Sequence, residues 1–406
     1  MKCRSCLEEV STIFIDLGNS PIANNLLERS ETPIDAPTYP LKVFVCDYCA
    51  LVQLPNLFSE SEIFGEDYVY YSSYSDSWLD HSKKFADEIS VELSLGEDDL
   101  VLEIASNDGY LLQYFSSRNI KVLGVEPTAG PAKIAISQNI PTEIQFLGKN
   151  TALALRDRGI SPKLIVANNV LAHVPNLRDF VEGISLLAND QTVITIEFPH
   201  LLKMIRNCQF DTIYHEHFSY LSVTSMRPLF LSFGLSIIDI REIGTHGGSL
   251  RLYLMKNSKF QANELVERFI QSEAEYDPRL DNVKEKFSQE VLKIRHNLLS
   301  EFEKWNEAGF KVIAYGAAAK GNTLLNFCGI DSSMIRFAVD RNPRKQGRLL
   351  PGSNIPIMSE DSLDCKTFDV VLILPWNISQ EIADQLVGFK EHGKRFVRAI
   401  PELEYL

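Results

Sequence analysis

The sequence predicts an α/β protein with a cysteine-rich N-terminal domain, a central doubly wound domain on a parallel sheet, and a smaller C-terminal domain of similar design. Two C-x-x-C pairs stand near the start of the chain. A strand, turn, helix and strand pattern runs from Leu100 to Glu126, and a second such unit begins at Phe310. Strands that alternate with helices in this way are typical of doubly wound, Rossmann-like parallel sheets.

Length and charge limit the classes of function. A chain of 406 residues is too long for one core, so ~2 to 3 domains are expected. The net charge of -14 disfavours broad contact with nucleic acid or with an anionic membrane surface. No apolar run reaches the ~18 residues of a membrane helix, so we expect a cytoplasmic protein. The oligomeric state stays open, and a monomer is plausible.

The two cysteine pairs predict a structural metal site. Cys3 and Cys6 form C-R-S-C, and Cys46 and Cys49 form C-D-Y-C about 40 residues later. Four thiolates match tetrahedral zinc and leave no open position for chemistry. The alternatives are four unligated thiols, or a redox pair, for which the surrounding strand–helix pattern is missing. Zinc would then stabilise a domain too small to hold itself together.

The unit from Leu100 to Glu126 predicts a cofactor site. Its first turn opens backbone N–H groups at a helix start, and Glu126 ends the second strand, where an acid can accept hydrogen bonds from both ribose hydroxyls. The G-x-G-x-x-G fingerprint of dinucleotide enzymes is missing, and Asn107 and Asp108 suit a ligand with an ammonium and a sulfonium. S-adenosylmethionine is therefore preferred over an unliganded unit or a dinucleotide. The expected cofactor contacts are Glu103, Ala105, Asn107, Asp108, Gly109, Glu126, Pro127, Asn168 and Asn169.

The most unusual stretch is Tyr214, His215, Glu216 and His217, four titratable residues between apolar flanks. A core could not bury such a set unpaired. Two histidines that are two residues apart do not have the helical spacing of a catalytic zinc site, which leaves a hydrogen-bond network or an acid/base site. We favour the acid/base site, in which Glu216 or a backbone carbonyl orients a neutral imidazole.

Further candidates lie before and after this stretch. Tyrosines 68, 70, 71 and 74 crowd ahead of a helix that leads into the cofactor unit, so one or two could line a pocket. His173 follows the strand that ends in Asn168 and Asn169. The paired glycines of THGGS predict a hairpin turn, with His246 in the pocket or on the surface.

The C-terminal third consists of a helical linker and the second unit. A stripe from Val283 to Trp305 with spacings of three and four predicts a long amphipathic helix that bridges two domains. Small residues and a lysine at the start of the next helix favour phosphate binding, although a domain without a ligand is the alternative. The expected substrate contacts are Gly316, Lys320, Gly321, Asn322, Asp340, Arg344 and Lys345.

Taken in order, the C-x-x-C head, EIASNDG, YHEH and YGAAAKGN resemble the family of nucleotide-sugar C-methyltransferases. These enzymes methylate carbon 3 of a 4-keto deoxysugar that is attached to a nucleotide diphosphate. The resemblance implies a zinc-binding domain (1–67), a methyltransferase domain that binds S-adenosylmethionine (68–262), connecting helices (263–309) and a Rossmann-like domain that helps to bind the nucleotide sugar (310–406). It leaves the sugar and the nucleotide open.

The resemblance also implies the pocket residues: Tyr68 or Tyr70, His173, Tyr214, Glu216 and His217. We expect His217 to be the base and Glu216 to orient it, while His173 or Tyr214 donates to the ketone oxygen; Tyr214 is the alternative base. A donor is needed because a base alone cannot ionise a carbon acid beside a ketone. The competing functions are an NAD-dependent nucleotide-sugar oxidoreductase or epimerase, and a zinc-stapled binding protein without catalysis.

Overall fold

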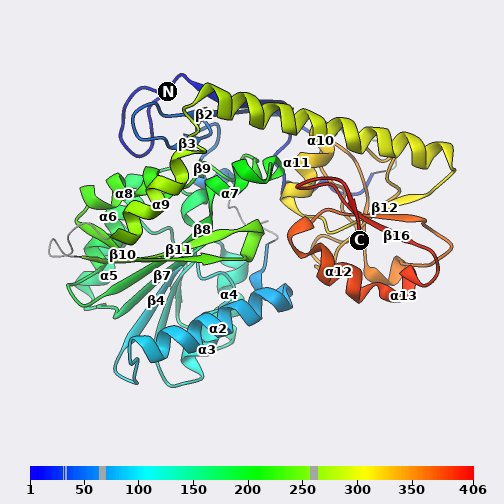
Figure 1. The fold of residues 1–406 in the computed structure, drawn as a ribbon. Helices are drawn as coiled ribbons and strands as arrows, with labels where there is room; N and C mark the ends of the chain where they lie inside the picture. Colours follow the sequence, from blue (N-terminus) through cyan, green and yellow to red (C-terminus); the bar gives the residue numbers. More distant parts are fainter. Residues whose placement is uncertain (31, 33, 64–69, 257–263) are drawn as a thin grey trace.

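The computed structural model describes all residues except 31, 33, 64–69 and 257–263. The N-terminal domain and the central sheet lie side by side at one end of the molecule, and the C-terminal domain lies at the other end (Figure 1). Tyr68 and the expected domain boundaries at 67–68 and 262–263 fall outside the described residues. Within the described residues, no helix has both the length and the apolar character needed to cross a membrane.

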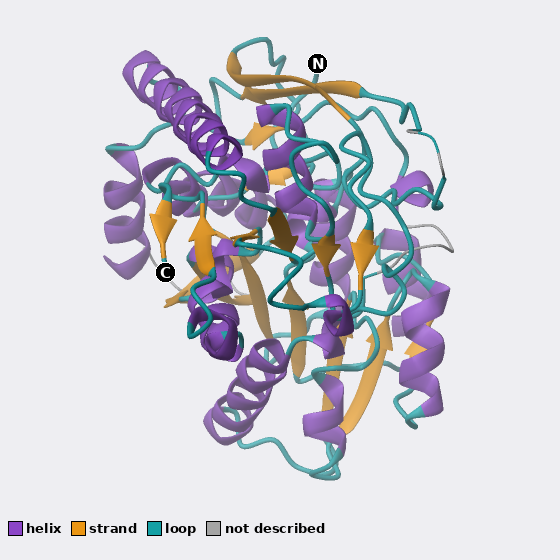
Figure 2. Cartoon of the chain, turned by 90° about the vertical axis from the view of Figure 1, so that its right-hand side faces the viewer, coloured by secondary structure: helices purple, strands orange, loops and turns teal. Residues whose placement is uncertain are grey.

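The N-terminal domain is built on a four-stranded antiparallel sheet. Its strands are β1 (Ile13–Ser20), β2 (Tyr39–Val45), β3 (Val52–Gln53) and β9 (Ser219–Tyr220), in that order. The short helix α1 (Glu60–Ile63) follows β3 in the chain. The long β1–β2 ribbon runs across the top of the molecule in Figure 2. Strand β9 comes from the stretch just after His217, so this sheet is completed by a distant part of the chain.

The central domain is a seven-stranded sheet in the order β10-β11-β8-β7-β4-β5-β6. The parallel strands are β4 (Leu100–Ile104), β5 (Lys121–Val125), β6 (Thr142–Glu143), β7 (Leu164–Asn168) and β8 (Val193–Pro199). The antiparallel strands are β10 (Leu235–Ile243) and β11 (Ser249–Lys256). Its helices are α2 (Asp76–Glu92), α3 (Leu112–Ser116), α4 (Ala129–Ser137), α5 (Lys149–Asp157), α6 (Leu177–Leu187), α7 (Leu201–Arg206) and α8 (Val223–Ser232).

The strand order of the central sheet places its ligand crevice. The chain leaves β4 toward β5 on one side and later returns to β7 on the other side, so the order reverses at β4. Ligands of doubly wound sheets bind outside the carboxyl ends of the strands at such a point. The turns after β4, β5 and β7 therefore share one crevice, which is where the sequence places the cofactor residues.

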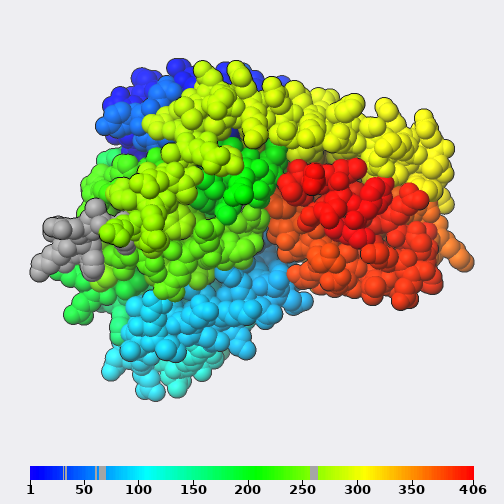
Figure 3. All heavy atoms as spheres, viewed as in Figure 1, coloured from blue at the N-terminus to red at the C-terminus, as the bar shows by residue number. Residues whose placement is uncertain are grey.

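The predicted linker consists of two helices, α9 (Glu264–Ala274) and α10 (Asp281–Glu307). The predicted apolar stripe of α10 is confirmed, because all seven of its residues are buried. The ring of Phe287 packs against Phe14 of β1, with centroids 5.2 Å apart. Figures 1 and 3 show α10 lying over both the N-terminal domain and the C-terminal domain. These two domains share one continuous apolar core with α10.

The C-terminal domain has a six-stranded sheet in the order β14-β13-β12-β15-β16-β17. Its strands are β12 (Val312–Tyr315), β13 (Ala338–Val339), β14 (Ile357–Met358), β15 (Val370–Ile373), β16 (Arg395–Arg398) and the antiparallel β17 (Glu404–Tyr405). Its helices are α11 (Ala319–Cys328), α12 (Ser379–Gln385) and α13 (Val387–Lys390). The sheet is again Rossmann-like, and α11 begins at the carboxyl end of β12.

Candidate active site

The turn after β4 is shaped by unusual backbone angles and held by Glu126. Ala105, Asn107 and Gly109 all have positive φ (55°, 49° and 81°). The Glu126 carboxylate accepts hydrogen bonds from the backbone N–H of Asn107 (2.9 Å) and of Thr128 (2.8 Å). Burial raises the pKa of Glu126. A Cβ on Gly109 would lie 2.5 Å from the side chain of Ile140, so the turn needs glycine for close packing as well.

Asn107 and Asp108 hold the tyrosine segment in place. The Asn107 side-chain oxygen accepts from the Ser72 N–H (2.9 Å), and the Asp108 carboxylate accepts from the Ser73 hydroxyl (2.6 Å). Both serines belong to the short helix η1 (Ser72–Tyr74) that precedes α2. Both side chains therefore hold the adjoining wall, and Asn107 also lines the cavity at this turn, whereas Asp108 does not.

A cavity of about 320 Å³ opens at the carboxyl ends of β4, β5 and β7. All three domains contribute to its wall: Asn24 from the N-terminal domain, the central turns, and Ala318 to Lys320 from the C-terminal domain. The predicted residues that line it are Tyr70, Ala105, Asn107, Glu126, Pro127, Asn168, Asn169, His173, Tyr214, His217, Lys320 and Lys345. Residues predicted for the cofactor, the catalysis and the substrate thus meet in one space.

Several cavity residues were not predicted from the sequence as site residues. Phe146 and Leu147 follow β6 and face the cavity together with Pro127, next to Glu126. This apolar slot is suited to a flat base beyond the ribose. Trp78 and Tyr110 form another wall. Their positions depend on how the strand ends and helix starts meet, and no motif in the sequence indicates them.

Asn168 and Asn169 lie at the end of β7 and line the cavity. Within the described residues, the side-chain oxygen of Asn168 and both polar side-chain atoms of Asn169 have no hydrogen-bond partner. Asn169 has φ 53°, and its N–H donates to the Glu197 carbonyl (2.7 Å), which fixes its backbone. Buried polar groups are rarely left unpaired, so these amides are suited to a polar ligand.

Glu103 is one of three predicted cofactor residues outside the cavity lining, together with Asp108 and Gly109. It lies within β4, is fully buried, and does not line the cavity. Burial raises the pKa of its carboxyl well above the usual value. Its contact with the cofactor remains a prediction.

The four titratable residues 214–217 are divided between two sides, with the outer two on one side and the inner two on the other. Tyr214 and His217 line the cavity, whereas His215 and Glu216 point toward the N-terminal domain. The Glu216 carboxylate accepts from the Asn24 N–H (2.9 Å), and His215 packs against Phe58 with ring centroids 5.7 Å apart. The core can bury all four residues because two of them face the cavity and the other two contact the N-terminal domain.

His217 is held in one tautomer. Its Nδ1 lies 2.7 Å from the Thr212 carbonyl oxygen, which can only accept, so Nδ1 carries the proton and Nε2 has a lone pair. The Tyr214 hydroxyl lies 2.8 Å from this Nε2. A backbone carbonyl orients the ring, and the Glu216 carboxylate, which we expected to do so, bonds elsewhere. Burial and the nearby His173 hold the pKa of His217 well below its usual value.

His173 is likewise neutral and held in one tautomer. Its ring centroid lies 4.6 Å from that of His217, and its Nδ1 lies 2.7 Å from the Glu216 carbonyl oxygen. Burial lowers the pKa of His173 to about 4, so the ring is neutral at pH 7. Its Nε2 therefore has a lone pair and no proton to donate.

Two lysines bring the C-terminal domain into the cavity. The Lys320 ammonium donates to the Asn377 side-chain oxygen (2.7 Å) and lies 4.6 Å from the centre of the Trp376 ring. Burial lowers its pKa. Lys345 donates to the Ala317 carbonyl (2.8 Å). Both ammonium groups retain N–H donors that are suited to an anion.

The other predicted substrate residues do not line the cavity. Gly316 and Gly321 allow close packing, since a Cβ on either would lie 2.6 Å from Pro375 or Leu374. Asp340 accepts from the Ala317 N–H (2.8 Å), and Asn322 is fully buried in α11. Arg344 lies over the Tyr71 ring, 4.6 Å from its centre, and so connects the C-terminal domain with the central domain.

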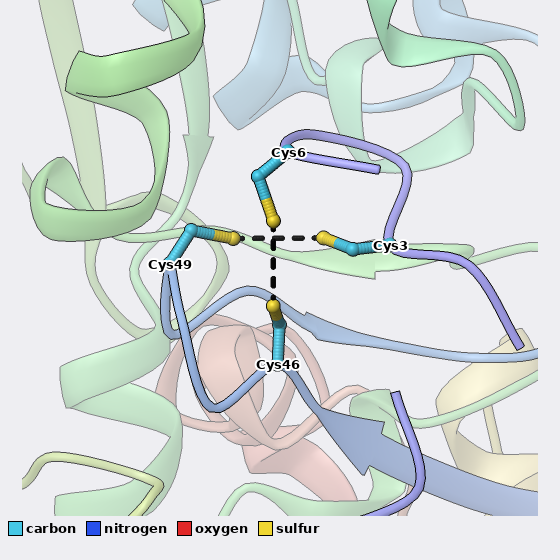
Figure 4. A group of neighbouring side chains, drawn as sticks. All are labelled: Cys3, Cys6, Cys46 and Cys49. Atoms are coloured by element: carbon cyan, nitrogen blue, oxygen red, sulfur yellow. Dashed lines mark hydrogen bonds between the residues drawn. The ribbon is translucent and has the colours of Figure 1, made fainter. Parts of the chain in front are cut away.

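The four cysteines form a site that fits a metal. Their sulfur atoms all lie within 4.8 Å of one another, and the Cys3–Cys49 and Cys6–Cys46 pairs are 3.5 Å apart (Figure 4). Zinc–sulfur bonds of about 2.3 Å place tetrahedral sulfurs ~3.8 Å apart. No other metal-ligand group of this kind occurs in the part of the chain that the structure describes. The donor set and its size match structural zinc.

Sequence models of known families match most of the chain. The model of a zinc binding domain matches residues 3–64, that of a methyltransferase domain matches 78–240, and that of a C-methyltransferase C-terminal domain matches 244–401. The C-methyltransferase NovU of Streptomyces niveus is 31% identical over 402 residues, which cover 99% of this chain and 96% of that protein.

Among solved structures, the similarity is confined to part of the chain. A Burkholderia thailandensis 1,6-didemethyltoxoflavin-N1-methyltransferase aligns with 53% of this chain and 98% of its own, at 13% identity and a TM-score of 0.37. An S-adenosylmethionine-dependent methyltransferase of Clostridium acetobutylicum aligns with 44% of this chain and 92% of its own, at 11% identity and a TM-score of 0.35.

Proposed function

The chain belongs to the S-adenosylmethionine-dependent C-methyltransferases with an N-terminal zinc-binding domain, and we propose that it methylates carbon 3 of a 4-keto deoxysugar carried by a nucleotide diphosphate. One observation carries this proposal. The neutral His217–Tyr214 pair shares a single cavity with the turn held by Glu126 and with Lys320 of the C-terminal domain. A base, a cofactor site and an anion site thus surround one volume.

The cofactor is assigned to the side of the cavity at β4 and β5. Glu126 has carboxylate lone pairs left for the ribose hydroxyls, and the slot of Pro127, Phe146 and Leu147 is suited to adenine. Asn168 and Asn169 offer their amides to the amino-acid end. When bound, S-adenosylmethionine supplies an electrophilic methyl group and leaves as S-adenosylhomocysteine.

The substrate is assigned to the side that faces the C-terminal domain. Lys320 and Lys345 hold ammonium groups at the cavity, where they can neutralise the charge of a diphosphate. The sugar then lies between these lysines and the cofactor. The wall between the two sites also contains His173, Tyr214 and His217.

The His217–Tyr214 pair acts as the base in this proposal. The Tyr214 oxygen takes the proton from carbon 3 as its own proton passes to Nε2 of His217, so that the imidazole ends with both nitrogens protonated. The electron pair of the broken C–H bond moves into the enolate, and carbon 3 then attacks the methyl group. The depressed pKa of His217 keeps the ring neutral and ready to accept at pH 7.

The experiment is a product analysis. The purified chain is incubated with S-adenosylmethionine and a panel of nucleotide diphosphate 4-keto sugars, and the products are analysed by mass spectrometry. A gain of one methyl group at carbon 3 supports the proposal. Loss of S-adenosylmethionine with methylation at oxygen, or a reaction only with sugars that lack the ketone, would overturn it.

A further inference from the structure

His246 is the cavity imidazole whose ring nitrogens have no hydrogen bond to the described protein. It lines the cavity, and its ring lies 5.4 Å from that of Trp78. His173 and His217 each use Nδ1–H on a backbone carbonyl. The Tyr214 hydroxyl lies against His217. Of the three cavity histidines, His246 therefore has an N–H available for a ligand.

The backbone of His246 is strained and firmly held. Its φ of 53° lies in the left-handed region, which costs a residue with a Cβ free energy. The hairpin tip around it is fixed on several sides. The Thr245 hydroxyl donates to the Glu197 carboxylate (3.1 Å), and the Gln209 amide donates to the Gly247 carbonyl (2.8 Å). Strain that the surroundings maintain is typical of functional positions.

The position of the hairpin favours the substrate over the cofactor. His246 joins β10 and β11, and β11 lies three places from β4 in the sheet, away from β5 and Glu126. A Cβ on Gly247 would lie 2.4 Å from Trp376, so the tip packs tightly against the C-terminal domain. Trp376 is also the ring beneath the Lys320 ammonium. His246 thus faces the part of the cavity assigned to the nucleotide sugar.

The protonation state of His246 suits a hydrogen bond to a neutral oxygen. Burial and the nearby Lys320 lower its pKa to about 4, so the ring is neutral at pH 7 and has one N–H and one lone pair. The lone pair would oppose an anionic phosphate, for which Lys320 is better suited. A ketone oxygen accepts the N–H and gains most from it when negative charge develops there.

We propose that His246 donates a hydrogen bond to the ketone oxygen of the reacting sugar and stabilises the enolate that forms when carbon 3 loses its proton. The inference rests on the proposed function. It assigns to His246 the role of hydrogen-bond donor to the ketone, which the sequence analysis gives to His173 or Tyr214. In the described structure, Nδ1 of His173 bonds a backbone carbonyl and the Tyr214 hydroxyl bonds His217. His246 is then a catalytic residue in the wall of the cavity.

Two variants separate catalysis from backbone effects. His246→Gly removes the donor and relieves the left-handed strain, whereas His246→Asn keeps an amide N–H on a residue that tolerates this conformation. Asn119→Gly is the matched control, because Asn119 also has positive φ (61°) and lies outside the cavity. The control should leave turnover and cofactor affinity unchanged.

The decisive readouts are turnover and exchange of the carbon 3 hydrogen with deuterated water in the presence of S-adenosylhomocysteine. Removing one such donor typically lowers kcat by ~10²-fold or more, so we expect His246→Gly to lower turnover and exchange together by about this factor. His246→Asn should recover part of the loss. Affinity for S-adenosylhomocysteine should stay within a few-fold, and the melting temperature of the glycine variant should be equal or higher.

Each other outcome overturns the inference. Exchange and turnover near wild type would mean that another group polarises the ketone. An equal loss of S-adenosylhomocysteine affinity would place His246 at the cofactor, and a lower melting temperature with parallel loss of all functions would make it structural. If the wild-type chain neither exchanges nor methylates any sugar of the panel, the proposed function itself fails. If the wild-type chain turns over normally and the glycine variant is equally active, only the role of His246 fails.

Discussion

The guanidinium of Arg4 donates a hydrogen bond to the carbonyl oxygen of Phe218, 2.9 Å away, and so connects the cysteine site to the residue that follows His217. Arg4 stands between Cys3 and Cys6 and is 7% exposed. The same carbonyl accepts from the Leu54 N–H (3.0 Å), where β3 and β9 pair. The zinc-binding domain thus supports the backbone that carries the base.

Arg4 is therefore predicted to be a positioning residue. Arg4→Met should lower kcat ~10-fold with little change in KM for S-adenosylmethionine, because a charge-assisted bond worth about 1.5–3 kcal/mol no longer fixes the chain beside His217. Arg178→Met is the matched control: Arg178 donates to the Ser5 carbonyl (2.9 Å) in the same cysteine loop and has no described contact with residues 214–220. Steady-state kinetics and zinc content check both variants, and equal kinetic losses in the two would contradict the prediction.

Zinc removal should disrupt the N-terminal domain. Cys46→Ser is expected to release the metal, because a structural site needs all four thiolates, and to unfold the sheet that β9 completes. Metal analysis and tryptic digestion of the N-terminal region check this. Cys365→Ser, at a half-buried cysteine outside the cluster, is the control. A folded, protease-resistant variant without zinc would count against a structural site.

His217→Ala should abolish turnover while affinity for S-adenosylmethionine stays within a few-fold, since the imidazole serves proton transfer. Tyr214→Phe should show a comparable loss if the two act as one unit. Because the pKa of His217 lies well below 6.5, activity should fall on the acid side only at a pH well under that value. Turnover and isothermal titration calorimetry check these expectations. An active Tyr214→Phe variant would assign the base to His217 alone.

Glu126→Gln should weaken binding of S-adenosylmethionine by ~1–3 kcal/mol, because the amide loses an acceptor for the ribose hydroxyls and for the turn. Glu143→Gln is the control. Glu143 ends the neighbouring strand β6, and its carboxylate pairs with Arg158 (2.7 Å) outside the cavity. Calorimetry measures both affinities. Unchanged binding by Glu126→Gln would mean that the adenosine lies elsewhere.

Asp211 should make stability depend on pH. Its fully buried carboxyl accepts from the Trp376 indole N–H (2.7 Å), and burial raises its pKa to about 7, from 3.8. A raised carboxyl pKa contributes stability that is present below pH 3.8 and lost as pH rises through 7. Asp211→Asn keeps an acceptor without this titration. Its melting temperature relative to wild type should therefore rise from pH 5 to pH 8 and then level off.

Thermal melts from pH 5 to pH 8.5 check this, with Asp190→Asn as an exposed control. A difference between Asp211→Asn and wild type that stays constant with pH would show that Asp211 titrates in the normal range. The depressed pKa values of His173 and His246 act in the opposite direction, because their stability contribution is lost as pH falls from 6.5 to about 4. Comparison with wild type cancels them.

The sequence predicted a feature well where a local pattern of residues is compatible with few structures. The C-x-x-C pairs predicted the sulfur cluster, and the periodicity of α10 predicted its buried stripe. The strand ends at Ile104, Val125 and Asn168 placed the cofactor turns on one edge, since parallel strands share their carboxyl ends. The assignment of individual side chains was weaker: Asp108 and Glu216 bind neighbouring segments instead of facing the cavity.

The sequence by itself determined the order of domains, the metal ligands and the set of titratable residues, because spacing and strand–helix alternation are local properties. Only the tertiary structure decided which of these titratable side chains face the cavity together. The division of residues 214–217 between the cavity and the N-terminal domain depends on β9 joining a sheet whose other strands lie more than 160 residues earlier. The position of the hairpin tip likewise depends on distant segments, because His246 contacts Trp78 and Gly247 packs against Trp376. Such contacts arise from packing between distant segments, which no local pattern encodes.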